Sequence, residues 1–372
     1  MSDDERILRA VQARDADLQA ISAFILAHPE LAHEEVECSR FLVGVLERAG
    51  FTVETGAAGL PTAFRAELDT GTPGGTVGLA AVYDAAPAHR TWDGATVPTH
   101  SCGHSAQAAG VVTAALALAD LRDELTGSVV VVGCPADEIH APETQRRGSG
   151  KALTAAGGAW AGVDAALYPH PEFLDAVWTD TLWMRRETAT VEGTRTLRDD
   201  VDPAPLTALA QLTGALEGLP RANVMLETLV LDGDVEEGSG LSLRAQFLTF
   251  SQTREDLDDL LAPVRQAVPE AVWERGNEID AIRPDQGVAD VVRDAFAAAG
   301  RPVLSDTPPL PFATDFGAVT RTVPAALVGV GRPEGWSFHR EGGEAQFAGP
   351  EGTQIARDIA RVLALAGSRL MA

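Results

Sequence analysis

A cysteine and a histidine two positions apart, Cys102 and His104, stand in the segment THSCGHSAQAAG, at the start of an alanine-rich run. A thiol and an imidazole at this spacing allow three interpretations: a buried thiol beside an incidental histidine, a nucleophile with its base, or two ligands of a metal ion. These two residues alone do not decide among them. The choice depends on whether the chain brings further ligand-type side chains to the same place.

Further groups of these chemical types stand later in the chain, each after an apolar run. The adjacent acids Asp137 and Glu138 follow GSVVVVGC, His170 follows GVDAALY, and His339 follows VPAALVGVG. Thiolate, imidazole and carboxylate are the groups that bind zinc and similar divalent ions. Taken singly, each residue could be a solvated loop side chain, so a metal site requires that they converge.

The apolar runs indicate the elements that must position these residues. Four of them predict strands of a sheet covered on both faces, and segments with helical periodicity separate them. Strands that alternate with helices indicate a largely parallel α/β sheet. Ligands of such sheets bind beyond the carboxyl ends of the strands, which is where the candidate residues fall. The four runs are TVGLAAVYDA, GSVVVVGC, GVDAALYPHP and VPAALVGVG.

The pattern changes between residues 185 and 283, where the predicted order is β-α-β-β-α-β. This order is typical of a ferredoxin-like α+β unit. We therefore expect residues 1–184 and 284–372 to form an α/β domain, with residues 185–283 as an inserted second domain. Within the insert, the segment TREDLDDLLAPVRQAV predicts a helix with Thr253 as its N-cap.

Composition excludes several classes of function. The 372-residue chain has a formal net charge of -25, which argues against nucleic acids and anionic membranes as partners. Its three cysteines do not suggest a disulfide scaffold, and no apolar run approaches the ~18 to 20 residues of a membrane span. We expect a soluble, cytoplasmic protein. Lys151 is the only lysine, which we interpret as a bias of the source genome toward arginine.

Several segments together resemble those of M20-type metallopeptidases in order and spacing. The likeness is greatest to the amidohydrolase branch, which includes aminoacylase-like, auxin-conjugate and aminobenzoyl-glutamate hydrolases. It implies hydrolysis of an amide in a small molecule, such as an N-acyl amino acid or a peptide-like conjugate. It also implies an insert that acts as a lid and forms a homodimer. The segments are HPELAHEE, SCGH, GCPADE, GGAWAGVDAALYPHP, ATDFG and SFH.

The resemblance further implies two bound divalent ions, zinc foremost, with manganese, cobalt or nickel as alternatives. Cys102 would be shared between them, and Asp137 would be the general base that takes a proton from water. Thr314 and Asp315, in ATDFG, would border the pocket and contact the substrate or the metal ligands. The remaining ligands would be Glu138 and His339 at one metal, and His104 and His170 at the other.

The chain departs from the family pattern in several places. The family usually has two glutamates where this chain has Asp137 and Glu138, and the shorter aspartate withdraws its carboxylate by roughly 1 to 1.5 Å. The additional residues IHAPETQRR follow this pair. The histidine that the family carries early in the insert is replaced by Leu197, and Arg195 or Arg198 could supply the positive charge instead.

Other functions remain open on the sequence. Cys102 could be the nucleophile of a thiol hydrolase with His104 or His170 as its base, although a two-residue spacing suits this poorly. The chain could also be a relative that binds metal and ligand without hydrolysing an amide. A hydrolase of an unusual biosynthetic intermediate, or a metal enzyme of another reaction class, completes the alternatives.

Overall fold

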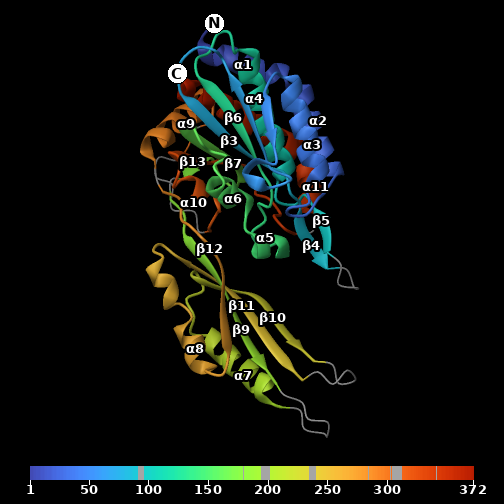
Figure 1. Cartoon of the computed structure of the whole chain (residues 1–372), viewed down its shortest axis with the longest axis vertical. Coiled ribbons are helices and arrows are strands. Elements are labelled where there is room, and N and C mark those ends of the chain that lie inside the picture. The colour runs from blue at the N-terminus through green and yellow to red at the C-terminus, as the bar shows by residue number, and fades with distance from the viewer. Residues whose placement is uncertain are drawn as a thin grey trace. The chain divides into compact units, whose positions relative to one another are not determined.

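The computed structural model describes residues 1–90, 96–178, 180–193, 202–233, 240–283, 285–301, 303, 312–340 and 342–372. Two compact units make up the chain (Figure 1). The first contains Met1–Asp180 and most of the chain from Ile282 onward, and the second contains Thr181–Ala281 with a short segment that ends at Thr314. Each unit has its own sheet.

A seven-stranded sheet in the order β1-β2-β6-β3-β7-β13-β8 forms the centre of the first unit. Its four middle strands run parallel to one another. They coincide with the four apolar runs, so the prediction of a largely parallel α/β sheet is confirmed. Their side chains are almost all buried, as in sheets with both faces covered. These strands are β6 (Ser128–Cys134), β3 (Thr76–Val82), β7 (Ala165–Glu172) and β13 (Ala325–Gly331).

The sheet edges are antiparallel, which the sequence did not lead us to expect. β1 (Thr52–Thr55) and β2 (Phe64–Asp69) form one edge, and β8 (Ala176–Trp178) forms the other. A short hairpin of β4 (Ala86–Arg90) and β5 (Thr96–Thr99) follows β3 and precedes the Cys102 segment.

Helix α4 (His104–Asp120) begins at one of the candidate site residues and is buried along nearly its whole length. It contacts β3 and packs against α12 (Pro350–Met371), α2 (Asp15–Ala27) and α1 (Asp3–Ala13). Its alanine-rich sequence allows this close approach of several helices, because small side chains let backbones come near one another. The packing of α4 thereby fixes the position of the residues that precede it.

The other helices of the first unit are shorter or more peripheral. Helix α6 contacts β6 and also packs against α10, which begins within the ATDFG segment. These two helices bring distant parts of the chain to the carboxyl end of β6. The remaining bounds are α3 (Val36–Arg48), α5 (Pro142–Arg147), α6 (Gly150–Ala156), α9 (Gln286–Ala298), α10 (Phe316–Val319) and α11 (Gly343–Ala348).

The second unit has the predicted β-α-β-β-α-β order. Its antiparallel sheet has the strand order β10-β11-β9-β12, which is the ferredoxin-like arrangement. One face of the sheet packs against the two helices, and the core between them includes Phe247 of the sheet and Leu212 of the first helix. The elements are β9 (Trp183–Glu192), α7 (Ala204–Leu216), β10 (Val224–Asp232), β11 (Ser242–Ser251), α8 (Ala262–Ala267) and β12 (Val272–Ile279).

The predicted continuous helix over residues 253–268 is wrong. A single 3-10 turn, Glu255–Asp258, is followed by the short α8, which starts at Ala262. Pro263 explains the break, because in a continuous helix it could not donate an N–H to the carbonyl of Asp259 and its ring would clash with that carbonyl. The N-cap of this turn is Arg254 and not the predicted Thr253, although Oγ1 of Thr253 accepts a hydrogen bond from the backbone N–H of Asp256 at 3.3 Å.

Among the described residues, no helix combines the length and the apolar composition that a membrane span requires.

Candidate metal centre

The candidate residues meet at the carboxyl ends of the four parallel strands. These strands are neighbours in the order β6-β3-β7-β13, so the segments that follow them share one edge of the sheet. The register aligns Val82 at the end of β3 with Cys134 at the end of β6. His170, near the end of β7, is opposite Gly329 in β13. Side chains from segments far apart in sequence therefore lie at the same edge of the sheet.

The sulfur of Cys102 belongs to two groups of possible metal ligands. One group is Cys102, His104 and His170, and the other is Cys102, Glu138 and His339. In each group, the ligand atoms all lie within 4.8 Å of one another. All five predicted metal ligands are thus brought together, in two sets that share the sulfur.

Hydrogen bonds orient two of the imidazoles toward the sulfur. Nδ1 of His104 lies 2.8 Å from the carbonyl oxygen of Asp84 and 2.9 Å from its Oδ1. Nδ1 of His170 lies 2.7 Å from the carbonyl oxygen of Pro171, and its Nε2 lies 3.7 Å from Sγ of Cys102. Because each Nδ1 faces an acceptor, it carries the proton and leaves Nε2 as the ligand atom.

Two buried polar atoms support the presence of a cation. Nε2 of His104 and Oε1 of Glu138 are buried, and neither has a hydrogen-bond partner in the described part of the chain. An unpaired polar atom in the interior usually costs ~1 to 3 kcal/mol, so such atoms commonly mark a missing ion or water. Both atoms belong to the ligand sets, and thiolate, imidazole and carboxylate donors fit a divalent ion of the zinc type.

The adjacent acids Asp137 and Glu138 have different surroundings. Oε2 of Glu138 lies 3.3 Å from Nε2 of His339, inside the ligand set. Asp137 points elsewhere: its Oδ2 accepts a hydrogen bond from the hydroxyl of Tyr168 at 2.9 Å, and its Oδ1 forms an ion pair with Lys151. Oδ2 of Asp137 is nevertheless only 3.3 Å from Nε2 of His104, so this carboxylate borders the cluster without belonging to it.

A sequence model of the family described as "Peptidase family M20/M25/M40" matches residues 64–345, which is well over half of the chain. The chain belongs to this family.

This chain matches its curated relatives over only part of their length. It is 32% identical to one of the subunits of p-aminobenzoyl-glutamate hydrolase of Escherichia coli (strain K12) over 173 residues, 44% of this chain and 34% of that protein. It is 33% identical to thermostable carboxypeptidase 2 of Saccharolobus solfataricus over 116 residues, 30% of this chain and 29% of that protein. The matched segments therefore span about a third of these relatives.

Solved structures extend the likeness to the whole fold. The YXEP protein of Bacillus subtilis, described as a dinuclear metal binding peptidase from the M20 family, aligns with a TM-score of 0.69 at 17% identity, covering 97% of this chain and 99% of that one. Aminobenzoyl-glutamate utilization protein of Klebsiella pneumoniae aligns with a TM-score of 0.70 at 14% identity, covering 97% and 98%. At these identities the likeness establishes the fold alone, and the family match over residues 64–345 is what confirms the resemblance to M20 proteins.

Sequence reasoning missed several residues that shape the M20 site. Asp84 is fully buried, and its Oδ2 accepts a hydrogen bond from the backbone N–H of Glu138 at 2.9 Å. Its position directly after an apolar strand could have identified it. Glu35 is also fully buried and accepts hydrogen bonds from the backbone N–H groups of Ala136 and His33, both at 2.8 Å. Glu35 therefore holds the loop that carries Asp137 and Glu138. In the sequence, the only sign of this role was its position in the family-like segment HPELAHEE.

The predicted substrate-contacting residues have separate positions. Asp315 is buried in the first unit, where its Oδ1 lies 2.7 Å from Nζ of Lys151 and its Oδ2 accepts a hydrogen bond from the Lys151 backbone N–H. Thr314 belongs to the second unit. The position of the expected family histidine, Leu197, and its possible substitutes Arg195 and Arg198 lie outside the described residues.

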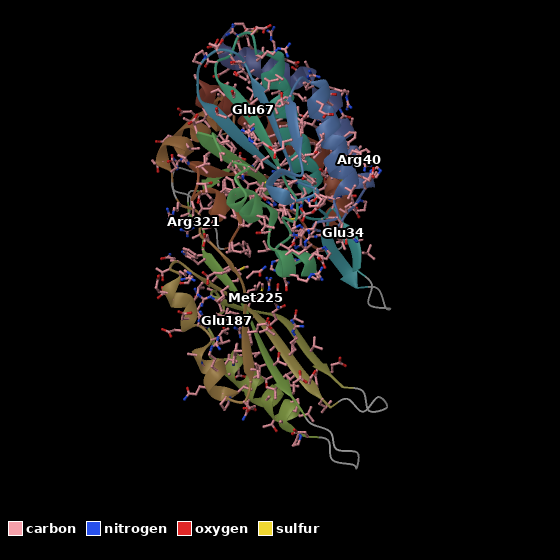
Figure 2. All side chains as sticks on the ribbon, viewed as in Figure 1. Glu34, Arg40, Glu67, Glu187, Met225 and Arg321 are labelled. Carbon is pink, nitrogen blue, oxygen red and sulfur yellow. The ribbon has the colours of Figure 1, made fainter. Side chains whose placement is uncertain are left out.

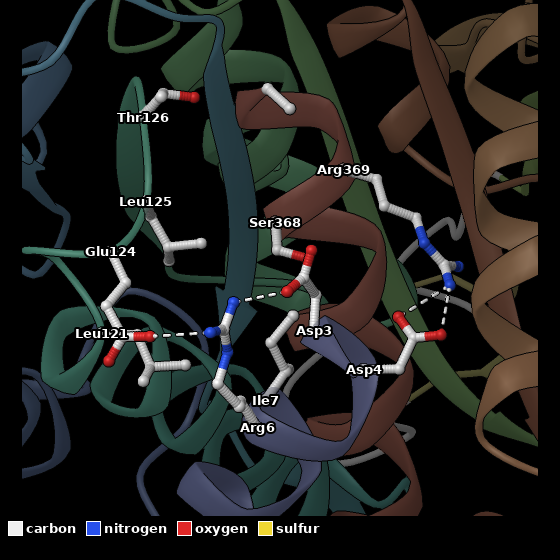
Figure 3. Close-up of a pocket in the computed structure, with 11 residues that line it drawn as sticks. Asp3, Asp4, Arg6, Ile7, Leu121, Glu124, Leu125, Thr126, Ser368 and Arg369 are labelled. Atoms are coloured by element: carbon white, nitrogen blue, oxygen red, sulfur yellow. Dashed lines mark hydrogen bonds and ion pairs between the residues drawn. The ribbon is translucent and has the colours of Figure 1, made fainter. Parts of the chain in front are cut away.

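A hollow of about 340 Å³ lies at the other end of the first unit, between α1, the end of α4 and α12 (Figure 3). Arg6 lies 3.5 Å from Glu124, and Arg369 lies 3.0 Å from Asp4. The first pair ties α1 to the segment after α4, and the second ties α12 to α1. Helix α4 begins at His104 in the candidate metal centre and ends at Asp120, and the hollow adjoins the next residue, Leu121. At a rise of 1.5 Å per helical residue, the hollow is about 25 Å from the candidate metal centre. It takes no part in the site.

Without metal, the M20 site is an ion cluster centred on a thiolate. Burial and the Glu138 carboxylate act to raise the pKa of Cys102, but His104 and His339 outweigh them and lower it to about 5. The thiolate in turn raises the pKa of His339 to about 11, against the effect of burial. Burial also opposes the charged form of His170, yet Cys102 and Glu172 raise its pKa to about 9. The metal-free imidazoles are therefore protonated at neutral pH.

We predict that metal binding to the metal-free protein releases protons, because an ion can bind these imidazoles only in their neutral form. Full loading at a pH of about 7 should release about three protons, one each from His104, His170 and His339. Calorimetric titration with zinc in buffers of different protonation enthalpy measures this number. Zinc affinity should also rise as the pH increases, and an affinity independent of pH between about 6 and 8 would contradict the ion cluster.

Proposed function

We propose that the chain is a metal-dependent hydrolase of an amide bond in a small molecule, an N-acyl amino acid or a peptide-like conjugate. The observation that carries this proposal is the sulfur of Cys102, which two sets of ligand atoms share beside a carboxylate that belongs to neither. Relatives named as a carboxypeptidase and as a p-aminobenzoyl-glutamate hydrolase support an amide substrate. The YXEP description supports two ions per site.

The five ligand residues would hold two divalent ions, one in each set. We propose zinc, with manganese, cobalt or nickel as alternatives, because a thiolate ligand disfavours magnesium and calcium. Such ions supply Lewis acidity, which makes a water more acidic and polarises an amide carbonyl. The five side chains are Cys102, His104 and His170 in one set, and Cys102, Glu138 and His339 in the other.

Asp137 is placed to be the general base. Its Oδ2, which faces His104, would take a proton from the attacking water as the water oxygen bonds to the carbonyl carbon. The same oxygen would then give the proton to the amide nitrogen as the carbon–nitrogen bond breaks. Tyr168, which donates to this oxygen, would keep it aimed at the reacting atoms. Thr314, in the second unit, remains our candidate for a substrate contact.

The thiol-hydrolase alternative has one supporting observation, the thiolate of Cys102 at 3.7 Å from the imidazole of His170. That reaction would leave Glu138, His339 and Asp137 without a role. Rapid inactivation by iodoacetamide that bound metal does not slow would favour it, since a thiolate engaged by two ions is shielded from alkylation. A relative that binds metal and ligand without hydrolysis would instead contain metal and fail to cleave any amide.

We also propose that the second unit acts as a lid and joins two copies of the chain. The edge strand β10 exposes Met225, Leu229, Val230 and Leu231, and Figure 2 shows Met225 on this strand. An exposed apolar edge strand pairs readily with another strand, whereas the opposite edge, β12, carries the exposed charges of Glu274 and Arg275. A second copy of β10 is the occupant that we propose.

Two matched sets of variants test the site assignment. Asp137→Ala should lower kcat by ~100-fold or more while both ions remain bound, because the base touches no ion. Glu138→Gln and His339→Ala should each lower bound metal from two ions toward one, because each removes a ligand of a single set. Metal content by mass spectrometry and rates on a panel of N-acyl amino acids give both results. Full activity in Asp137→Ala would refute its role as base.

The dimer proposal predicts that the wild-type chain sediments as a dimer and that Leu229→Lys or Leu231→Lys gives a monomer. A lysine on the edge adds a charge that must be desolvated when two strands pair. Val272→Lys is the matched control, because Val272 is an even more exposed apolar side chain and lies on the opposite edge strand, β12. Since β12 takes no part in the proposed interface, this variant should remain dimeric. A monomeric wild-type chain at micromolar concentration would overturn the proposal.

A further inference from the structure

The one lysine of the chain lies at the candidate active site. Lys151 is fully buried, and its ammonium forms ion pairs with Oδ1 of Asp137 and with Oδ1 of Asp315, the latter at 2.7 Å. The same nitrogen lies 4.1 Å from the centre of the Tyr168 ring. A buried charge is costly unless it is paired, and here two carboxylates and an aromatic face surround it. This lysine therefore has specific partners at the site, which genome bias alone does not explain.

The local backbone is arranged to bring Lys151 close to the acid pair. Lys151 is the second residue of α6, and Gly150 before it approaches the loop so closely that a Cβ would lie 1.6 Å from the carbonyl oxygen of Pro135. The backbone N–H of Gly150 donates to the carbonyl oxygen of Ala136 at 3.2 Å. Only glycine permits this contact, and it places the start of α6 beside Asp137.

Asp315 fixes Lys151 from the other side. Its Oδ2 accepts the Lys151 backbone N–H at 2.9 Å while its Oδ1 pairs with the ammonium, so one carboxylate holds both ends of the lysine. The neighbouring α10 begins directly after Asp315 and packs against α6. The ammonium is therefore held at a fixed point, and Asp137 has to adapt to it.

The ion pair separates the roles of the two carboxylate oxygens of Asp137. Lys151 occupies Oδ1, and Oδ2 is left facing Tyr168 and the Nε2 atom of His104. A positive charge on Oδ1 also disfavours a metal ion there, because two cations on one oxygen repel each other. Asp137 can therefore border the ligand sets without becoming a ligand, although Glu138 beside it is one of their members.

We propose that Lys151 is the positioning residue for Asp137, anchoring Oδ1 of its carboxylate so that Oδ2 is presented to the reacting water. The anchor compensates for the shorter side chain of aspartate, because a fixed ion pair replaces the reach of a longer acid. Asp315 acts one step further away by holding Lys151. This inference rests on the proposed function of Asp137 as base, and it adds a residue that sequence reasoning had treated as compositional bias.

The kinetic test replaces the charge with an apolar chain of similar length, Lys151→Met. With Asp137 free to turn, kcat should fall by ~100-fold, while KM and the content of bound metal stay unchanged. Arg40→Met is the matched control, since it removes one positive charge from an exposed position on α3 (Figure 2) and should leave kcat unchanged. A Lys151→Met protein with wild-type kcat would overturn the proposal.

A double-mutant cycle tests whether Lys151 acts through Asp137. In an Asp137→Ala background, adding Lys151→Met should change the residual rate by less than about threefold, because the group that Lys151 positions is already absent. A full additional ~100-fold loss would show that Lys151 acts by another route and would overturn the proposal.

A spectroscopic readout uses the fact that the chain has a single lysine. Protein labelled with 15N-lysine should give one side-chain ammonium signal, slow to exchange with water, which shifts in Asp137→Asn and in Asp315→Asn. A signal that Asp137→Asn leaves unchanged would contradict the contact, even if Lys151→Met failed to fold. If the wild-type chain cleaves no amide, the proposed function fails while this contact is still tested. Loss of turnover in Asp137→Ala but not in Lys151→Met would overturn only the role of Lys151.

Discussion

A thiolate among buried side chains is the interaction on which the rest of the site depends. Cys102 is half-buried, and its sulfur lies beside the buried His104 and Glu138, where a negative charge is stable only when opposite charges surround it. In the metal-free protein, protonated His104 and His339 provide that charge. Two divalent ions would provide the positive charge in place of the protonated histidines, and the imidazoles would then bind the ions as neutral ligands. The same atoms thus serve two charge-balanced states, which couples metal binding to proton release.

The surrounding residues keep each functional group in one orientation. Asp84 links the ligand His104 to the backbone of Glu138, and Glu35 holds the loop between β6 and the acid pair. Lys151 separates Asp137 from the ligand sets, so that adjacent acids serve different purposes. These supports come from the end of β3, from the segment before α3, and from α6. The proposed base and ligands are therefore oriented by buried groups that lie outside both ligand sets.

The meeting of the candidate ligands at one sheet edge could be predicted, because strand ends indicated the edge and the resemblance to M20 proteins selected the five residues among the polar ones there. Apolar runs identified the four middle strands, and polar residues after strand ends converge whatever the details of packing. The same reasoning could not find Lys151, since its contact with Asp137 depends on how closely α6 approaches the loop at Gly150. It also missed the antiparallel edge strands β1 and β2, which are short and lack a continuous apolar run.

The insert shows where pattern reasoning fails locally. The order of its elements was evident from alternating strand and helix signals, and the ferredoxin-like strand order followed. The second helix was predicted too long because the apolar spacing of TREDLDDLLAPVRQAV continues through the whole segment, while the helical backbone is interrupted between Asp258 and Ala262, just before Pro263. Periodicity indicates which face of a segment is apolar, but a single proline can interrupt the helix that the periodicity predicts.

The most direct test of the account is anomalous X-ray diffraction from crystals grown with zinc. We predict two anomalous peaks per chain, each about 2.3 Å from Sγ of Cys102, one also bonded to His104 and His170 and the other to Glu138 and His339. A single peak, or two peaks of which one lies away from the sulfur, would contradict a shared thiolate and with it the proposed arrangement of the site.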